Sequence, residues 1–577
     1  MTTKRLGGGD LLARTLKQAG VDQVFALHGG HLEGLLKGCV DQDIRLLDFR
    51  HEAAAGHAAD AYARATARLG VCFVTAGPGI ANAMPAVVNA FLDATPMLFI
   101  IGAPPLREAE TNPLQGGFDQ IAAFTPVSKW AHRITATERI PDLTAMAIRH
   151  AMTGKRGPVV LELPIDVLHM SVDADLATQP TGLAVAPRPA PTPEDAAAAL
   201  ALLSGAERPC IIAGGDAAQS QCGAALRAFA EKTGIPVFAN SKALGLIPMD
   251  HPLSAGSPSG LAMLAMTGQP LPDAVLVLGA RFGLLLGGRS QAIVPPDAKV
   301  AQIYSDAAEI GRIRDVDVAI AADSRAALEA FNRAADAYEW RRDSGWAAQA
   351  TAPQNAMAPL YPTAESAKGI HPFHAVRMVM AKAGPGAAYA FDGGEAASWG
   401  GDLVRVDGPG RTLGHGYLGC LGIGPGFAIG LQKAFPDRRV VQLTGDGAMG
   451  FHIQEFDTMV RHSLPVVTVV LNNQVWGMSI HGQQIMFGGN YSVITRIEGT
   501  HYANIAASFG CHAERVERIA DLEAALDRAF ACGKPALVEI MTDPDAMHPV
   551  TQAMLGQPEA GSPDIIIPYY ENIPGGA

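Results

Sequence analysis

The sequence predicts an α/β protein made of three doubly wound domains, each built on a parallel sheet. Short apolar runs alternate with amphipathic stretches along most of the chain, which is the pattern of strands connected by crossover helices. The chain has 577 residues, too many for a single hydrophobic core. Two stretches in which the alternation dissolves divide it into three α/β segments.

The first segment, residues 1–172, contains apolar runs that we interpret as strands, with helical periods between them. These strands are expected at residues 24–27, 45–49, 71–75, 97–101 and 159–163. In a parallel sheet of this kind the ligand lies at the carboxyl ends of the strands. A Pro-rich stretch at residues 184–193 is interpreted as a linker to the second segment.

The second and third segments repeat the pattern. In residues 190–335 strands are expected at 210–213, 237–239 and 274–278, and residues 338–372 are interpreted as a second linker. In residues 365–542, which have the densest glycine spacing, strands are expected at 440–443 and 466–471. The tail, residues 543–577, contains an apolar run at 565–570, which we expect to dock on the protein because exposed apolar area is costly.

Composition disfavours several classes of protein. Lys and Arg number 44 against 56 Asp and Glu, a net charge of −12, so there is no basic field to attract nucleic acid or an anionic membrane. No apolar run reaches the roughly 18 residues of a membrane-spanning helix, and the first residues do not resemble a signal peptide. The 7 cysteines form no CxxC pair, which predicts free thiols, no zinc site and a cytoplasmic location.

The sharpest motif is TGDG at residues 444–447, which follows one predicted strand and precedes Asn473 at the end of the next. Because neighbouring parallel strands end at the same edge, the Asp446 carboxylate and the Asn473 amide should converge. Such oxygens suit a Mg²⁺ ion bound together with a diphosphate. Gly445 and Gly447 would let backbone N–H groups approach phosphate oxygens. A lone GDG can also be an ordinary turn.

A second motif places Glu52 in the first turn of an alanine-rich helix, after the predicted strand at 45–49. A Glu at this position ordinarily compensates the helix dipole on the surface. A glycine-rich turn, AGPG at residues 76–79, follows a neighbouring predicted strand.

With these motifs the chain resembles the thiamine diphosphate enzymes of the acetolactate synthase and benzaldehyde lyase superfamily. The resemblance covers almost the whole chain and implies an aminopyrimidine-binding domain (1–172), a central domain (190–335) and a diphosphate-binding domain (365–542). Within the superfamily the chain is most similar to benzaldehyde lyase. The runs that carry this likeness are LHGGH at 27–31, TNPLQGG at 111–117, KWAHR at 129–133, LGARFGL at 278–284 and HGYLG at 415–419.

The resemblance implies thiamine diphosphate and Mg²⁺ as cofactors. Glu52 would exchange a proton with the pyrimidine ring, which lets the cofactor lose its C2 proton. The metal would be held by Asp446, Asn473 and the backbone carbonyl of Val475. Leu421 would support the bent cofactor, or would be a plain core leucine. The other predicted cofactor contacts are Gly77, Gly419, Gly445 and Gly447.

The substrate pocket is likewise implied by the resemblance. His31 and Gln115 would face the substrate and move its protons, although a histidine after a strand is often structural. Ile165 and Ala397 stand where the family likeness leads us to expect Trp and Tyr, so the predicted pocket has fewer aromatic groups. The remaining predicted pocket residues are His28, Gly30, His415, Trp476 and Ile480.

The implied activity is a reversible carbon–carbon lyase and carboligase that cleaves 2-hydroxy ketones or 2-hydroxyacyl compounds to aldehydes or ketones through an enamine intermediate. The first alternative is a 2-hydroxyacyl-CoA lyase that forms formyl-CoA, because the tail at 543–577 is similar to the lid-like tails of such enzymes. The second is an acetolactate-synthase-type enzyme or a 2-oxo acid decarboxylase. A nucleotide-binding regulatory module built on the central segment is a non-enzymatic alternative, against which Glu52, Asp446 and Asn473 argue.

The expected partners are a small carbonyl or acyl-CoA substrate and further copies of the chain, with neither nucleic acid nor a membrane among them. In this superfamily the site lies between subunits, so we expect at least a homodimer and favour a homotetramer.

Overall fold

The computed structural model describes residues 4–554, apart from 109–110, 112–113, 178–179, 181–182, 184–186, 289–290, 292, 342–344 and 353–359. Its contacts divide the chain into two units, each described here by itself. The N-terminal unit comprises Met1–Pro187, His415–Pro436 and Phe451–Val466, and the C-terminal unit comprises Arg188–Gly414, Asp437–Gly450 and Val467–Ala577. The tail beyond residue 554, including the predicted apolar run, lies outside the described residues.

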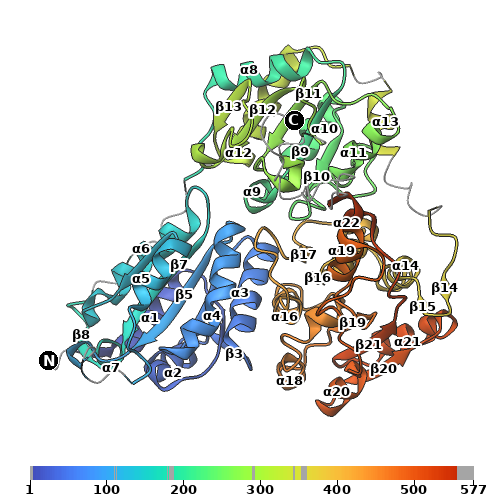
Figure 1. Cartoon of the computed structure of the whole chain (residues 1–577). Helices are drawn as coiled ribbons and strands as arrows, with labels where there is room; N and C mark the ends of the chain where they lie inside the picture. The colour runs from blue at the N-terminus through green and yellow to red at the C-terminus, as the bar shows by residue number, and fades with distance from the viewer. Residues whose placement is uncertain are drawn as a thin grey trace. The chain divides into compact units, whose positions relative to one another are not determined.

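The N-terminal unit contains a 6-stranded parallel sheet in the order β3-β2-β4-β5-β7-β6. Figure 1 labels β3, β5 and β7 of this sheet. The predicted strands correspond closely to all strands of the sheet except β6, whose WAHR sequence is partly exposed throughout and has no apolar run. The strands are β2 (Gln23–Ala26), β3 (Arg45–Asp48), β4 (Gly70–Val74), β5 (Met97–Ala103), β6 (Trp130–Arg133) and β7 (Pro158–Pro164). A separate antiparallel pair joins β1 (Arg5–Gly7) to β8 (Ser171–Asp173).

Helices of the N-terminal unit follow the strands, as the alternating pattern predicts. Two of its helices come from the last third of the sequence, and one of them, α16, packs along α3. The helices are α1 (Gly8–Gln18), α2 (Glu33–Asp41), α3 (Glu52–Thr66), α4 (Pro78–Leu92), α5 (Gln120–Phe124), α6 (Ile140–Met152), α7 (Ile165–His169), α16 (Gly424–Ala434) and α18 (Glu455–Arg461).

The C-terminal unit contains a 5-stranded parallel sheet in the order β10-β9-β11-β12-β13. Its strands are β9 (Pro209–Ala213), β10 (Val237–Ala239), β11 (Ala274–Leu278), β12 (Lys299–Tyr304) and β13 (Val318–Ala321). Strands β12 and β13 were not predicted from the sequence. Its helices are α8 (Pro193–Ser204), α9 (Gly215–Gln219), α10 (Gly223–Thr233), α11 (Ser259–Met266) and α12 (Ser324–Ala334). Because α8 begins at Pro193, the predicted linker at 184–193 ends where this helix starts.

The C-terminal unit also holds a 6-stranded parallel sheet in the order β17-β16-β18-β19-β21-β20. Its strands are β16 (Ala388–Asp392), β17 (Thr412–Gly414), β18 (Val440–Gly445), β19 (Val467–Asn472), β20 (His512–Val516) and β21 (Ala536–Met541). The helices are α14 (Pro372–Ala383), α15 (Glu395–Leu403), α17 (Asp446–Met449), α19 (Gly477–Phe487), α20 (Tyr502–Ser508), α21 (Ile519–Ala531) and α22 (Pro549–Met554).

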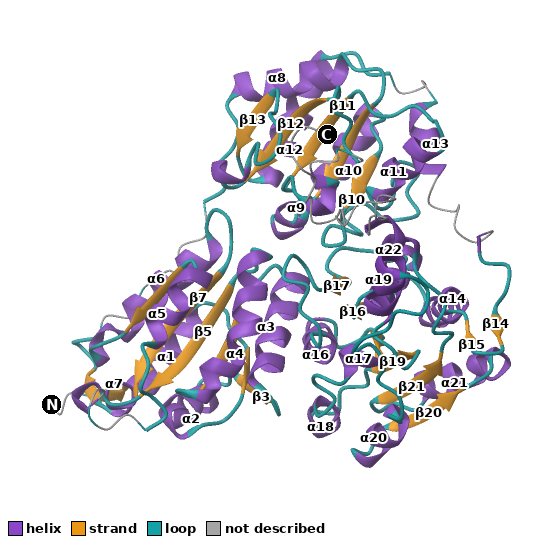
Figure 2. Cartoon of the chain, in the orientation of Figure 1, coloured by secondary structure: helices purple, strands orange, loops and turns teal. Residues whose placement is uncertain are grey.

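The three larger sheets are parallel and accompanied by helices (Figure 2), so the predicted α/β class with three parallel-sheet parts is confirmed. The boundaries at 1–172, 190–335, 365–542 and 543–577 stay predictions. The stretch at 338–372 is more ordered than a plain linker, because it contains α13 (Trp346–Thr351) and a hairpin of β14 (Glu365–Ser366) and β15 (Gly369–Ile370).

Candidate active site

The N-terminal unit places Glu52 at the first position of α3, directly after the turn that follows β3. His51 caps the helix, because its Nδ1 accepts a hydrogen bond from the backbone N–H of Ala53 at 3.1 Å. Unlike a surface residue that only compensates the helix dipole, Glu52 is 7% exposed. The Asn82 side chain of α4 donates to Glu52 Oε2 at 3.0 Å, and among the described residues no donor reaches Oε1. The carboxylate is therefore held at one oxygen and open at the other.

Gly77, between β4 and α4, adopts a backbone conformation that suits glycine, with φ of 63° and ψ of −107°. A Cβ at this position would lie 2.7 Å from the backbone oxygen of Gln115. The N–H of Gly77 donates to Gln120 Oε1 at 2.9 Å, and Gln120 Nε2 in turn donates to the Gly102 carbonyl and to Glu162. Gln120 is 1% exposed and holds the backbone of the predicted cofactor turn, although no sequence motif marks it.

His31 lies in the short 3₁₀ helix Gly30–Leu32 and is 7% exposed. Its Nδ1 lies 3.2 Å from the Thr75 hydroxyl, and the Gln115 side chain also forms a hydrogen bond with the ring. Burial lowers the pKa of His31, the charge of His169 lowers it further, and the bond to Gln115 opposes them. The ring is therefore neutral near pH 7 and can either accept or donate a proton.

The other predicted residues of this unit differ in their surroundings. His28 is exposed and pairs with Glu33 at 2.9 Å, so its side chain has a surface partner that His31 lacks. A Cβ on Gly30 or on Gly419 would meet no atom within 4 Å, so both glycines border open space. Ile165, His415 and Leu421 are half-buried, so Leu421 is not a fully enclosed core leucine.

The C-terminal unit brings Asp446 together with the loop after β19. Strands β18 and β19 pair in parallel, with Gly445 opposite Leu471, so the two strand ends meet as predicted. Asp446 Oδ1 accepts from the Gly447 N–H at 2.9 Å, and its Oδ2 accepts from the Gln474 N–H at 2.7 Å. Asn473 Oδ1 accepts the N–H of Val475 at 3.3 Å.

These residues fit a Mg²⁺ ion. Asp446 is 3% exposed, and burial raises the pKa of its carboxyl to about 7, although three backbone hydrogen bonds oppose this. A cation beside this carboxylate would offset the cost of burying its charge. The metal ligands that Asp446, Asn473 and Val475 can offer are all oxygen atoms, which Mg²⁺ prefers. No cluster of three or more His, Cys, Asp or Glu side chains that could hold a metal occurs within the described part of the chain.

Gly447 stays a predicted cofactor contact, and its packing gives a further reason for glycine at this position. Its N–H already binds the side chain of Asp446, and a Cβ would lie 2.5 Å from the Trp476 ring. Glycine is therefore required here by the packing of Trp476. At Gly445, by contrast, the nearest atom to such a Cβ is the Ala396 Cβ at 3.7 Å, which leaves space beside the turn.

Two buried residues behind this site have no sequence signal that we recognised. The Tyr502 hydroxyl donates to the backbone oxygen of Asp446 at 2.7 Å. Glu539, fully buried in β21, accepts from the Asn472 side chain at 2.7 Å and from the N–H of Ala503 at 3.0 Å. The ends of β18 and β19 are therefore braced from α20 and β21.

The helices that carry Ala397 and Ile480, the predicted pocket residues of this unit, also hold the beginning of the tail. Glu395 Oε1 lies 2.9 Å from His481 Nδ1 and accepts from the Thr551 hydroxyl at 2.7 Å. His481 Nε2 lies 2.9 Å from the Pro544 carbonyl. Helix α22 is thus anchored on α15 and α19.

The structure assembles the predicted residues in two groups. The N-terminal unit contains Glu52, His31, Gln115 and Gly77, and the C-terminal unit contains Asp446 and Asn473. The chemistry of the first group is proton transfer at a carboxylate and at a neutral imidazole, whereas the second offers oxygen ligands for a cation.

Three family models match the chain. Their descriptions are "Thiamine pyrophosphate enzyme, N-terminal TPP binding domain" for residues 6–123, "Thiamine pyrophosphate enzyme, central domain" for residues 196–331, and "Thiamine pyrophosphate enzyme, C-terminal TPP binding domain" for residues 392–540. No helix within the described ranges has both the length and the apolar character required to cross a membrane.

Curated relatives align with nearly the full chain. A protein of Mycobacterium bovis named probable acetolactate synthase is 34% identical over 552 residues, covering 94% of this chain and 96% of that protein. The acetolactate synthase isozyme 1 large subunit of Escherichia coli is 30% identical over 549 residues, covering 94% and 95%. A probable acetolactate synthase large subunit of Methanocaldococcus jannaschii is 28% identical over 587 residues, covering 98% of each.

Proposed function

This chain belongs to the thiamine pyrophosphate enzymes, and from that premise we propose that it is a lyase and carboligase that cleaves and forms carbon–carbon bonds in 2-hydroxy carbonyl compounds. Its cofactor is thiamine diphosphate, and Mg²⁺ is the usual metal partner in the family. The observation that carries the proposal is the buried, neutral His31 bonded to Gln115, in the unit that contains Glu52.

Glu52 serves the cofactor as a proton carrier in this proposal. Thiamine diphosphate, when bound, supplies a carbon nucleophile that adds to a carbonyl group and takes up the electron pair released when the adjacent bond breaks. Glu52 holds or releases a proton at Oε1, while Asn82 keeps the side chain in place through Oε2. The glycine at position 77 provides a narrow backbone turn against which the cofactor ring can pack.

Asp446, Asn473 and the carbonyl of Val475 hold Mg²⁺ and, through it, the diphosphate in this proposal. The position of Asp446 at the end of a parallel strand supports the assignment, as does the contact of its carboxylate with the loop that contains Asn473. Gly419, Gly445, Gly447 and Leu421 complete the proposed cofactor contacts.

His31 and Gln115 act on the substrate in this proposal. A neutral imidazole can take a proton from a substrate hydroxyl as the bond beside it breaks, and can return it in the direction of ligation. The Thr75 hydroxyl and the Gln115 side chain orient the ring for this transfer. Ile165, Ala397, His415, Trp476 and Ile480 remain proposed pocket residues, as do His28 and Gly30.

An acetolactate-synthase-type activity is the second candidate, and the names of the aligned relatives favour it. A panel of benzoin, acetoin, a 2-hydroxyacyl-CoA and pyruvate separates the candidates. The proposal expects aldehyde release from an acyloin. Acetolactate formation from pyruvate, with no cleavage of any 2-hydroxy compound, would overturn it in favour of the second candidate. A 2-oxo acid decarboxylase would release carbon dioxide and free aldehyde from pyruvate.

A 2-hydroxyacyl-CoA lyase is distinguished by the same panel and by the tail. The anchoring of α22 through Thr551 and Glu395 supports a tail that begins on the helices bearing Ala397 and Ile480. Deleting residues from Ala560 onward should lower kcat/KM for the thioester more than for benzoin if the tail is a lid. An equal loss on both, with lowered thermal stability, would indicate a tail that only stabilises the assembly.

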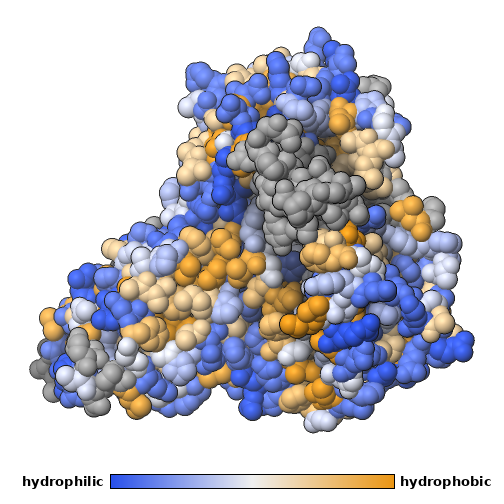
Figure 3. Space-filling model, in the orientation of Figure 1, coloured by the Kyte–Doolittle hydropathy of each residue, from blue (hydrophilic) through white to orange (hydrophobic). Residues whose placement is uncertain are grey.

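We also propose self-association, at least to a homodimer and preferably to a homotetramer. Both units expose apolar side chains among polar ones (Figure 3), and the large ones in the N-terminal unit include Leu114, Phe118, Leu418 and Phe451. Sedimentation equilibrium of the active enzyme tests this, and a fully active monomer would contradict it. Titration of cofactor into the apoprotein, followed by tryptophan fluorescence, tests the non-enzymatic alternative.

A further inference from the structure

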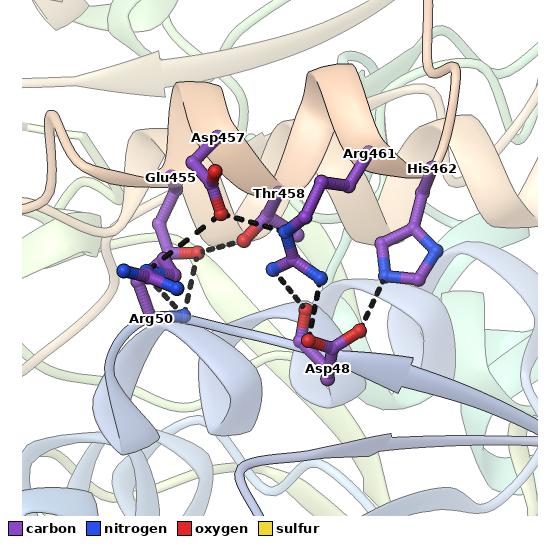
Figure 4. A network of polar contacts seen from close by, with 7 residues as sticks. All are labelled: Asp48, Arg50, Glu455, Asp457, Thr458, Arg461 and His462. Carbon is purple, nitrogen blue, oxygen red and sulfur yellow. Dashed lines mark hydrogen bonds and ion pairs between the residues drawn. The ribbon is translucent and has the colours of Figure 1, made fainter. Parts of the chain in front are cut away.

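Glu455 begins α18 in the N-terminal unit and is fully buried, although it is a carboxylate. Figure 4 shows its surroundings. Its Oε1 and Oε2 accept the backbone N–H of Arg50 at 3.2 and 3.3 Å, and the Thr458 hydroxyl donates to Oε2 at 2.6 Å. The backbone N–H of His51 also forms a hydrogen bond with this carboxylate.

The two N–H groups that Glu455 binds belong to the residues immediately before Glu52. They lie in the turn between β3 (Arg45–Asp48) and α3 (Glu52–Thr66), outside both elements. His51, the second of these residues, is also the cap of α3. The Glu455 carboxylate therefore holds the backbone of Arg50 and His51, and this backbone orients Glu52, the first residue of α3.

Other ion pairs, besides the contacts of Glu455, also connect α18 to this turn. On the surface around it, Asp48 pairs with Arg461 and His462, and Arg50 pairs with Asp457 (Figure 4). Burial raises the pKa of the Glu455 carboxyl to about 7, while the hydrogen bonds from Thr458 and the two N–H groups lower it. A buried carboxylate costs free energy that the exposed pairs do not, so it is a poor choice for attachment alone.

We propose that Glu455 is a positioning residue for Glu52, acting through the backbone N–H groups of Arg50 and His51. This inference rests on the proposed proton transfer by Glu52. It predicts that replacement of the Glu455 carboxyl group misorients Glu52 but leaves in place the residues that hold the metal, all of which lie in the other unit.

The test uses the Mg²⁺-loaded holoenzyme without substrate. Deuterium exchange at C2 of bound thiamine diphosphate is measured by acid quench and NMR, and cofactor affinity by tryptophan fluorescence. Glu455→Gln should slow the exchange by about 10-fold or more while the cofactor Kd changes by less than about threefold, because small misplacements of a reacting group have large kinetic costs. Thr458→Val, which keeps the carboxylate and removes one donor, should slow it less.

Asp48→Asn is the matched control, because it removes an exposed contact at the same junction. It should leave the exchange rate unchanged. The inference is overturned if Glu455→Gln exchanges at the wild-type rate, or if Asp48→Asn slows exchange equally. Glu52→Gln separates the two proposals: normal exchange in that variant refutes the role of Glu52 itself, whereas slow exchange there together with normal exchange in Glu455→Gln refutes only the inference about Glu455.

Discussion

Gly430 of α16 lies against the backbone carbonyl of Ala58 in α3, so closely that a Cβ on Gly430 would be 2.3 Å from that oxygen. Gly426, one turn earlier on the same face, lies similarly close to the carbonyl of Ala54, at 2.6 Å. Both partners are backbone atoms, which cannot swing aside. The helix that begins with Glu52 is thus matched to α16 by two glycines spaced four residues apart.

Gly430→Ala should destabilise the protein by about 1 to 3 kcal/mol, since the added methyl group forces the two helices apart. Urea denaturation followed by circular dichroism measures this. Gly401→Ala is the control, because Gly401 lies in α15 and a Cβ there meets no atom within 4 Å. That variant should keep its stability or gain up to about 1 kcal/mol. Equal midpoints for the two variants would contradict the close packing.

Glu52→Gln should leave the fold intact and lower turnover by roughly 10² to 10⁴-fold, because an amide cannot carry the proton that the carboxylate moves. Asn82 contacts only one oxygen of this side chain, so the isosteric amide can keep its place. Turnover and cofactor binding are measured on the same preparation. Near-normal turnover with bound cofactor would rule out the proposed role.

Arg64→Met should cost about 3 to 5 kcal/mol of stability, because it removes the cation that forms ion pairs with two buried carboxylates. Arg64 binds Asp60 at 2.6 Å and Asp93 at 2.9 Å, and neither carboxylate side chain is exposed. Arg68→Met, which removes an exposed pair with Asp22, should cost less than about 1 kcal/mol. Chemical denaturation of both variants checks the difference, and a similar small loss in each would argue against the buried triad.

The free energy of unfolding of the wild type should fall relative to Glu455→Gln as the pH rises from about 4.5 to 7. Burial raises the pKa of the Glu455 carboxyl from 4.5 to about 7 in the folded state, so the folded chain binds more protons than the unfolded chain in this window. The contribution of Glu455 to stability is fully present below the unfolded-state pKa of 4.5. It is lost as the carboxyl ionises in the folded state near pH 7, by up to about 3 kcal/mol. Denaturation at pH 5 and pH 8 measures the difference, and a pH-independent gap would contradict it.

The segment that carries α22 should loosen as the pH rises. Burial lowers the pKa of His481, but the hydrogen bond and charge of Glu395 and the Pro544 carbonyl raise it above its usual value overall. Both partners accept hydrogen bonds, so the ring satisfies both only when it is protonated. The stabilisation from the protonated His481 ring is therefore present below its unfolded-state pKa near 6.5. It is lost as the pH rises through the higher pKa of the folded state.

Amide hydrogen exchange of residues 544–551, corrected for the intrinsic pH effect, measures this loosening. Exchange should be faster at pH 8 than at pH 6, and His481→Gln should remove the dependence. His512→Gln is the control, because His512 also pairs with a carboxylate, but with that of Glu514 in its own strand, β20. Unchanged pH dependence in His481→Gln would assign the effect to another group.

The sequence by itself was sufficient for the features that depend on neighbouring residues. Apolar runs predicted most strands of the N-terminal sheet, and the glycine-rich strand ends predicted that Asp446 and the loop with Asn473 would meet. These signals are local, because a buried strand needs a continuous apolar run and a parallel crossover fixes where its ends lie. The strand β6 was missed because its WAHR sequence is partly exposed and has no apolar run, and β13 because its apolar run, VAIA, is only four residues long and partly exposed.

Only the tertiary structure decided which side chains support the site. Arg50 and Glu455 lie 405 residues apart in sequence, yet the backbone N–H of Arg50 donates to the carboxylate of Glu455. The same holds for Gln120 beneath Gly77, and for the Trp476 ring that requires glycine at position 447. No periodicity or motif encodes such contacts, because they arise when separate elements pack together and each buried polar group must find a partner.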